Sequence, residues 1–75
     1  MYDLIIKLTN GDDALVSDVQ YIKERSNNSG EITIIEKSDF QNVHPYSNYS
    51  YVFVGKDAIF NVLGNKIEYL HFRKG

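Results

Sequence analysis

Alternation of apolar and polar side chains is the feature that most constrains this chain. Over residues 51–72 the apolar positions follow a period of two, which is the repeat of a β-strand and not of a helix. The dipeptides Gly55-Lys56 and Gly64-Asn65 interrupt this pattern and have the composition of tight turns. The sequence therefore predicts strands at 51–54, 58–63 and 66–72, joined by two hairpins.

The N-terminal part of the chain has the same character. Residues 2–8 alternate, and they are followed by Asn10-Gly11, a dipeptide typical of type I′ hairpin turns because both central residues need positive φ. A two-residue loop at this place sets Ile6 opposite Leu15, so apolar residues meet apolar residues. We therefore predict a first hairpin with that register.

The middle of the chain is less regular. Residues 17–25 fit a short helix with a capping box or a bulged continuation of the second strand, and we favour the strand. Residues 26–30 have turn composition, and the β-branched stretch 31–37 predicts a third strand. Residues 38–50 contain the only proline and are expected to form a long loop, with a short helical turn at its start.

Length limits the domain organisation. A chain of 75 residues makes one domain, 1–75, with a small core. The fold we expect is mainly β: a five- to six-stranded antiparallel sheet, twisted or rolled into a small open barrel, with at most one short helix.

Both faces of the predicted C-terminal sheet are substantially apolar. A sheet face in contact with water is normally polar, so one of two things must cover the second face. Either the sheet curls over the N-terminal hairpin, or the face meets another chain. One face carries Tyr51, Phe53, Ala58, Phe60, Val62, Ile67 and Tyr69, and the other carries Val52, Val54, Ile59, Leu63, Leu70 and Phe72.

The residue types needed for catalysis or metal binding do not form recognisable patterns. The chain has no cysteine, which excludes disulfides, thiolate zinc sites and a cysteine nucleophile. His44 and His71 lack metal-ligand spacing, and no serine lies in a nucleophile motif. Asp12-Asp13 is interpreted as turn chemistry and not as a calcium loop. We expect neither an enzyme nor a bound cofactor or metal.

Charge and hydropathy bear on partners and location. The net charge is −2 with both signs interspersed, so nucleic acid is not the favoured partner. No apolar run approaches the roughly 20 residues of a membrane span. The opening residues have no signal-peptide pattern, and small secreted domains are usually rich in disulfides, so we expect a cytoplasmic location.

The most distinctive local feature is a run rich in tyrosine, from His44 to Tyr51. Tyrosine gives a large and rigid contact area and is enriched at protein interfaces. An unprotected strand edge is a second route to a partner, or to a homodimer. The candidate partner-binding residues are Tyr46, Tyr49 and Tyr51, together with those of Ile59, Leu70 and Phe72 that prove exposed.

In layout the chain resembles small accessory proteins of phages and prophages of Gram-positive bacteria. The features that carry the likeness are the opening strand into Asn10-Gly11, the step at 16–19, and the ending 52–57 and 63–72. The resemblance implies a role in binding a host or phage protein, and inhibitors of CRISPR nucleases are among such proteins.

The function we predict is accordingly a non-catalytic protein-binding module that occludes its partner. The alternative is a small nucleic-acid-binding barrel of the OB or SH3-like kind. It would use the same tyrosines for base stacking, and Lys56, Lys66, Arg73 and Lys74 for phosphate contacts.

Overall fold

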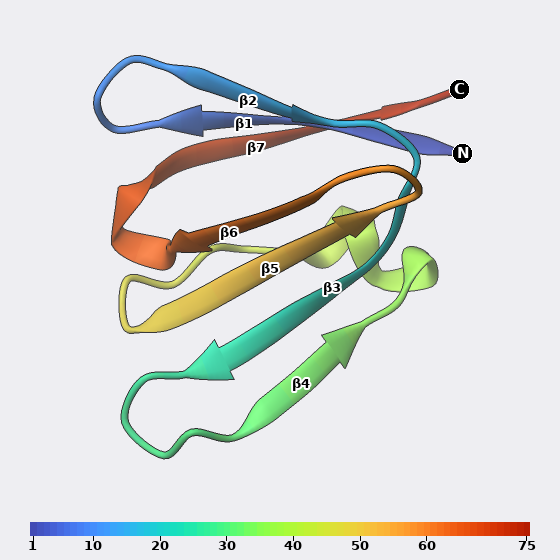
Figure 1. Cartoon of the computed structure of the whole chain (residues 1–75). Coiled ribbons are helices and arrows are strands. Elements are labelled where there is room, and N and C mark those ends of the chain that lie inside the picture. The colour runs from blue at the N-terminus through green and yellow to red at the C-terminus, as the bar shows by residue number, and fades with distance from the viewer.

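Seven strands form two antiparallel sheets in the computed structural model, which describes all residues 1–75 (Figure 1). The three-stranded sheet has the order β2-β1-β7, and the four-stranded sheet has the order β4-β3-β5-β6. The mainly antiparallel β fold is therefore confirmed, with seven strands in two sheets and no closed barrel. The strands are β1 (Tyr2–Leu8), β2 (Asp13–Val16), β3 (Val19–Ser26), β4 (Ile32–Ile35), β5 (Tyr49–Gly55), β6 (Ile59–Leu63) and β7 (Ile67–Lys74).

The first hairpin forms where it is predicted, but its loop is longer. Ile6 lies opposite Ala14, one residue away from the expected register. The Gly11 amide donates to the Leu8 carbonyl at 3.0 Å, and Gly11 alone in this turn has positive φ, at 95°. This is a three-residue loop with glycine in the left-handed position, so the type I′ turn prediction is wrong.

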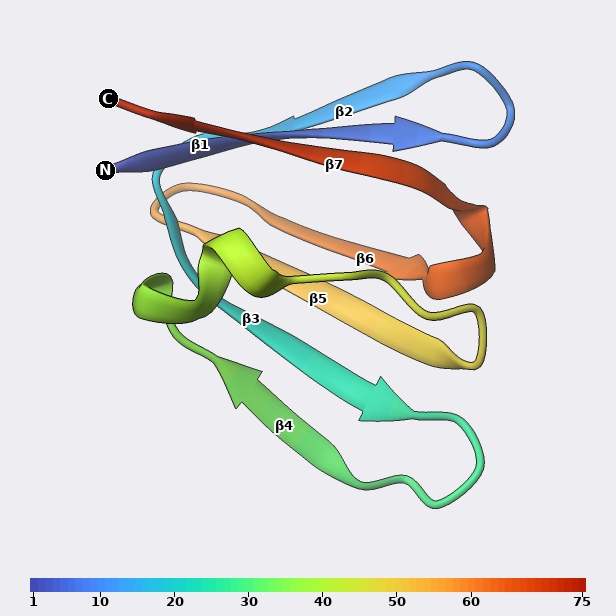
Figure 2. The ribbon, with the colours of Figure 1, turned by 180° about the vertical axis from the view of Figure 1, so that it is seen from behind.

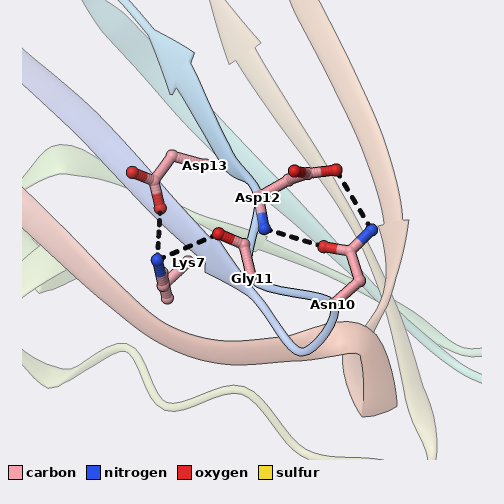
Figure 3. A network of polar contacts seen from close by, with 5 residues as sticks. All are labelled: Lys7, Asn10, Gly11, Asp12 and Asp13. Carbon is pink, nitrogen blue, oxygen red and sulfur yellow. Dashed lines mark hydrogen bonds and ion pairs between the residues drawn. The ribbon is translucent and has the colours of Figure 1, made fainter.

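Polar groups hold this turn in place (Figure 3). The Asn10 side chain accepts from the Asp12 amide at 2.9 Å and donates to the Asp12 carboxylate at 3.2 Å. Lys7 Nζ lies 3.3 Å from Asp13 Oδ1 and donates to the Gly11 carbonyl at 3.1 Å. The hydrogen bond and the charge of Asp13 raise the pKa of Lys7. Asp12 and Asp13 therefore both stabilise the turn, in agreement with their interpretation from the sequence.

The chain then crosses from one sheet to the other at Ser17-Asp18. Residues 19–26 are a strand, as favoured, but this strand pairs with β4 and β5 and does not continue β2. Asp18 has a φ of 50°, and its amide donates to the Asp3 carboxylate at 3.0 Å. The Asp18 carbonyl accepts from the Lys56 amide at 3.1 Å. These contacts fix a sharp corner between the sheets.

A second corner replaces the last predicted hairpin. Residues Gly64–Lys66 form a 3-10 turn, η2, and β7 leaves it to pair with β1. Because β6 and β7 belong to different sheets, the predicted pairing of Val62 with Ile67 is wrong. The β5–β6 hairpin does form, with Phe53 opposite Phe60. Its register differs from the prediction by two residues, so each side chain keeps its expected face.

The two sheets enclose one core with their inner faces. A further 3-10 segment, η1 (Lys37–Asn42), follows β4 at the place where the sequence predicts a helical turn (Figure 2). It has no side-chain cap. Its Phe40 packs 5.0 Å from the ring of Phe72 and 5.3 Å from that of Tyr2. The buried core residues are Leu4, Ile6, Val16, Val19, Ile22, Phe40, Tyr51, Phe53 and Ile67.

Candidate protein-binding surface

The tyrosine-rich run does not form one exposed cluster. Tyr51 is only 1% exposed, with its ring stacked on Phe53 in the core at 6.0 Å. Its hydroxyl donates to the Glu24 carboxylate at 2.8 Å and accepts from the Tyr46 amide at 2.9 Å. Burial and the Glu24 carboxylate raise the pKa of Tyr51 far above its ordinary value. The prediction of Tyr51 as a partner-binding anchor is therefore corrected: Tyr51 holds the loop to the core.

The other two tyrosines stay nearer the surface. Tyr46 is exposed, and its ring lies 5.7 Å from that of Tyr49 and 5.4 Å from that of His44. Tyr49 is half-buried and packs against the core. The carbonyl oxygens of both tyrosines lie over Gly64 at the η2 corner. Of the three tyrosines predicted to bind a partner, only Tyr46 is exposed.

The three partner-binding residues predicted on the last strands, Ile59, Leu70 and Phe72, also differ in exposure. Ile59 on β6 is 65% exposed. Leu70 and Phe72 on β7 are half-buried and pack against the core from the inner side. The β1–β7 register shifts between Lys7 and Leu8, so that Leu8 pairs with Ile67. This bulge places Ile67 on the inner side as well, whereas the sequence predicts Ile67 on the other sheet face from Leu70 and Phe72. Ile59 is therefore the exposed member of this set.

Ile59 belongs to a larger surface, the side of the four-stranded sheet that points away from the core. We call this surface the outer face. The strand registers align its residues in three rows, two across β4, β3, β5 and β6 and one across β3, β5 and β6. Its apolar members are Ile32, Ile34, Val52, Val54, Ile59 and Leu63, and its polar members are Tyr21, Lys23, Arg25, Ser50 and Asn61.

The outer face is unusual in composition for a face in contact with water. Ile32, Ile34, Ile59 and Leu63 are all between 46% and 65% exposed. A solvated antiparallel face is normally polar, but here large apolar side chains are exposed on both border strands of the sheet, β4 and β6, with the cations of β3 between them. The three-stranded sheet covers only the inner face of the four-stranded sheet, so the outer face remains exposed.

Charge on the outer face has one sign. Lys23 and Arg25 alternate along β3 in the middle of the sheet, and neither has an ion-pair partner. None of the eleven residues of the outer face is a carboxylate. The sequence interpretation missed this feature, because it treated the charges as evenly interspersed. The period-two spacing of Lys23 and Arg25 is the signal that places them on one face.

A hollow of about 260 Å³ lies on the other side of the same sheet, between β4, β3 and the loop after η1. Its lining includes the carboxylates of Glu24 and Asp39, with Ile35 and Tyr46. The Glu24 carboxylate is already bound by the Tyr51 hydroxyl. No group of three or more His, Cys, Asp or Glu side chains comes together here or elsewhere in the fold.

The basic residues of the alternative nucleic-acid hypothesis are spread over the molecule. Lys56 precedes β6 and Lys66 follows it, so the two lie at opposite ends of that strand. Arg73 and Lys74 lie at the end of β7, in the other sheet. These four residues therefore do not form one phosphate-binding patch beside the tyrosines.

Comparisons with known proteins give no further guide to this surface. No protein-family model, curated protein or solved structure matches the chain. The helical segments are 3-10 turns of six and three residues, and no helix of the fold has the length and apolar character to cross a membrane.

Proposed function

We propose that this domain is a non-catalytic protein-binding module that occupies, and so occludes, a surface of a partner protein through its outer face. The observation that carries the proposal is the set of exposed isoleucine and leucine side chains on β4 and β6, which lie on either side of Lys23 and Arg25 on β3. Exposed apolar area of this kind marks interaction surfaces, and its cations favour a partner surface that bears carboxylates. The resemblance to phage and prophage accessory proteins makes a host or phage protein the proposed partner, with CRISPR nucleases among the targets to test.

Two substitutions of equal chemistry test the proposal. Ile59 lies on the outer face and is 65% exposed, whereas Leu15 lies on β2 of the other sheet and is 64% exposed. Replacing either one by aspartate adds the same charge at the same exposure. Ile59→Asp should weaken binding to a captured partner by at least about tenfold, because the carboxylate must be desolvated and repels the carboxylates of the proposed partner.

The measurement is affinity capture from a Gram-positive host lysate, followed by a titration with the purified partner. The proposal is supported by a protein that binds the unmodified chain and Leu15→Asp but not Ile59→Asp. It fails if both variants bind equally well. Binding to labelled single-stranded DNA that weakens steeply with salt and is lost in Lys23→Ala would favour the nucleic-acid alternative instead.

A further inference from the structure

The edge strand β4 lacks the charges, prolines and bulges that often protect natural sheet edges. It bounds the four-stranded sheet and pairs only with β3. Its residues Ile-Thr-Ile-Ile include no charge, proline or glycine, and its register with β3 has no bulge. Charged residues, prolines and bulges are among the devices that keep sheet edges from pairing, and the short length of β4, four residues, is the one such device present here. Among the other edges, β2 and β7 carry charges, at Asp13, Glu68, Arg73 and Lys74, whereas β6 is also uncharged.

The backbone of β4 presents hydrogen-bonding groups at this edge. The Ser26 amide donates to the Glu31 carbonyl at 2.9 Å, which fixes the phase of the β3–β4 ladder. Because antiparallel residues alternate between bonded and free positions, Thr33 bonds toward Glu24 on β3. The amide and carbonyl groups of Ile32 and Ile34 therefore point away from the sheet.

We propose that β4 pairs antiparallel with β4 of a second copy of this chain, about a two-fold axis at Thr33. Ile32 then lies opposite Ile34 of the second copy, and the two outward positions form the hydrogen-bonded pairs. The four-stranded sheets of both copies join into one continuous sheet, which extends the outer face across the axis. The pairing goes beyond the proposed function and does not depend on it.

Self-complementarity is the reason to favour a second copy over another protein. A two-fold interface needs a patch that matches itself, and isoleucines placed symmetrically about Thr33 provide one. Ile32 is 53% exposed and Ile34 is 46% exposed, so each gains cover from the other across the joint. Paired β-branched residues and a Thr–Thr pair are both favourable cross-strand neighbours.

Charges do not oppose this register. Glu31 lies opposite Ile35 of the second copy, and Glu36 lies opposite Gly30, so no carboxylate faces another. Lys23 and Arg25 are on β3, and three strand spacings separate them from their counterparts, which is about 14 Å. That distance exceeds the screening length of about 8 Å at physiological salt.

Sedimentation equilibrium on the full chain, over a series of concentrations, tests the pairing. The unmodified protein should dimerise, and Ile34→Lys should raise the dissociation constant at least about tenfold, or about 1.4 kcal/mol. Leu15→Lys, with the same charge on the β2 edge, should leave the constant unchanged. A protein that stays monomeric throughout, or one that Leu15→Lys weakens equally, overturns the proposal.

Disulfide trapping tests the axis and does not depend on the stability of the lysine variant. The chain has no cysteine, so Thr33→Cys introduces a single thiol. In the proposed register the two Cα atoms at this position lie about 4.5 Å apart, within the range that a disulfide spans. Thr33→Cys should form covalent dimers under mild oxidation much faster than Leu15→Cys. Equal rates for the two variants would contradict the register.

The two proposals fail separately. A monomeric protein that still captures a partner, and loses it in Ile59→Asp, removes the self-pairing and keeps the proposed function. A dimer trapped through position 33 without any captured partner keeps the self-pairing alone.

Discussion

At the scale of single residues, Tyr51 shows how one side chain ties together segments distant in the sequence. Its ring is in the core, and its hydroxyl bonds to Glu24 on β3 and to the backbone at Tyr46 and His44. Loss of the phenolic proton would leave a buried negative charge beside the Glu24 carboxylate. Because burial and that carboxylate both disfavour ionisation, the pKa of Tyr51 is raised in the folded state.

Because the pKa of Tyr51 is raised in the folded state, the stability of the domain changes with pH in the alkaline range. Above about pH 10 the unfolded chain releases the tyrosine proton while the folded chain keeps it. Fewer protons on the unfolded state mean that the free energy of unfolding decreases as pH rises, by up to about 1.4 kcal/mol per pH unit for this one group. The stabilisation is fully present below pH 10. Urea unfolding at a series of pH values from about 8 to about 12 measures how steeply the free energy of unfolding falls with pH.

The variant Tyr51→Phe isolates this effect. It should lower the free energy of unfolding at neutral pH by about 1–3 kcal/mol, because Glu24 and the Tyr46 amide lose their partner. It should also make the alkaline decrease shallower. The raised pKa of Lys7 acts in the same direction and is present in both proteins, so the difference between them reports on Tyr51. An unchanged alkaline slope in Tyr51→Phe would contradict the argument.

At the scale of elements, local patterns predicted strands well and connections poorly. Strand β1 has the predicted bounds, and β5 extends the predicted strand by residues at both ends, because alternation is a property of the strand itself. The loop at Asn10-Gly11 has three residues where two were predicted, since the dipeptide is compatible with both. The corners at Ser17-Asp18 and η2 depend on the other sheet, and no local signal marks them.

Gly64 explains why the second corner resembles a hairpin in the sequence. A hairpin turn uses glycine for positive φ, but only Gly11 and Gly30 among the glycines have one. Gly64 is needed for space instead. A Cβ there would overlap the carbonyl oxygen of Tyr46 and lie 2.8 Å from that of Tyr49. The residue type is the same in both cases, and the physical reason for it differs.

This difference predicts opposite responses at two glycines. Gly64→Asn should destabilise the domain by about 1–3 kcal/mol or more, because the added side chain displaces the backbone at Tyr46 and Tyr49. Gly11→Asn should cost much less, because asparagine tolerates a left-handed backbone and nothing lies within 4 Å of a Cβ there. Thermal unfolding followed by circular dichroism compares the two. Equal losses would contradict the steric reason given for Gly64.

At the scale of the whole molecule, the sequence predicted the class of fold and two apolar sheet faces, but it left open whether the N-terminal hairpin or another chain covers the second face. It did not predict which strands share a sheet, because pairing between distant segments depends on the complete core. The candidate site changed for the same reason: Tyr51, Leu70 and Phe72 turn inward, while Ile32, Ile34 and Leu63 join Ile59 outside. Burial is decided by the second sheet, which alternation alone cannot place.

One core shared by two sheets implies that the domain unfolds as a unit. Ile6 on β1 and Ile22 on β3 are both fully buried, in different sheets but in the same cluster. Removing one methylene from either, as Ile6→Val or Ile22→Val, should lower the free energy of unfolding by about 0.5–1.5 kcal/mol. Neither sheet retains a closed core without the other, so both variants should shift one common transition. Far-ultraviolet circular dichroism and tyrosine fluorescence should then give coincident curves. Curves that separate in Ile6→Val alone would mean that the three-stranded sheet opens independently, and that the outer face persists without it.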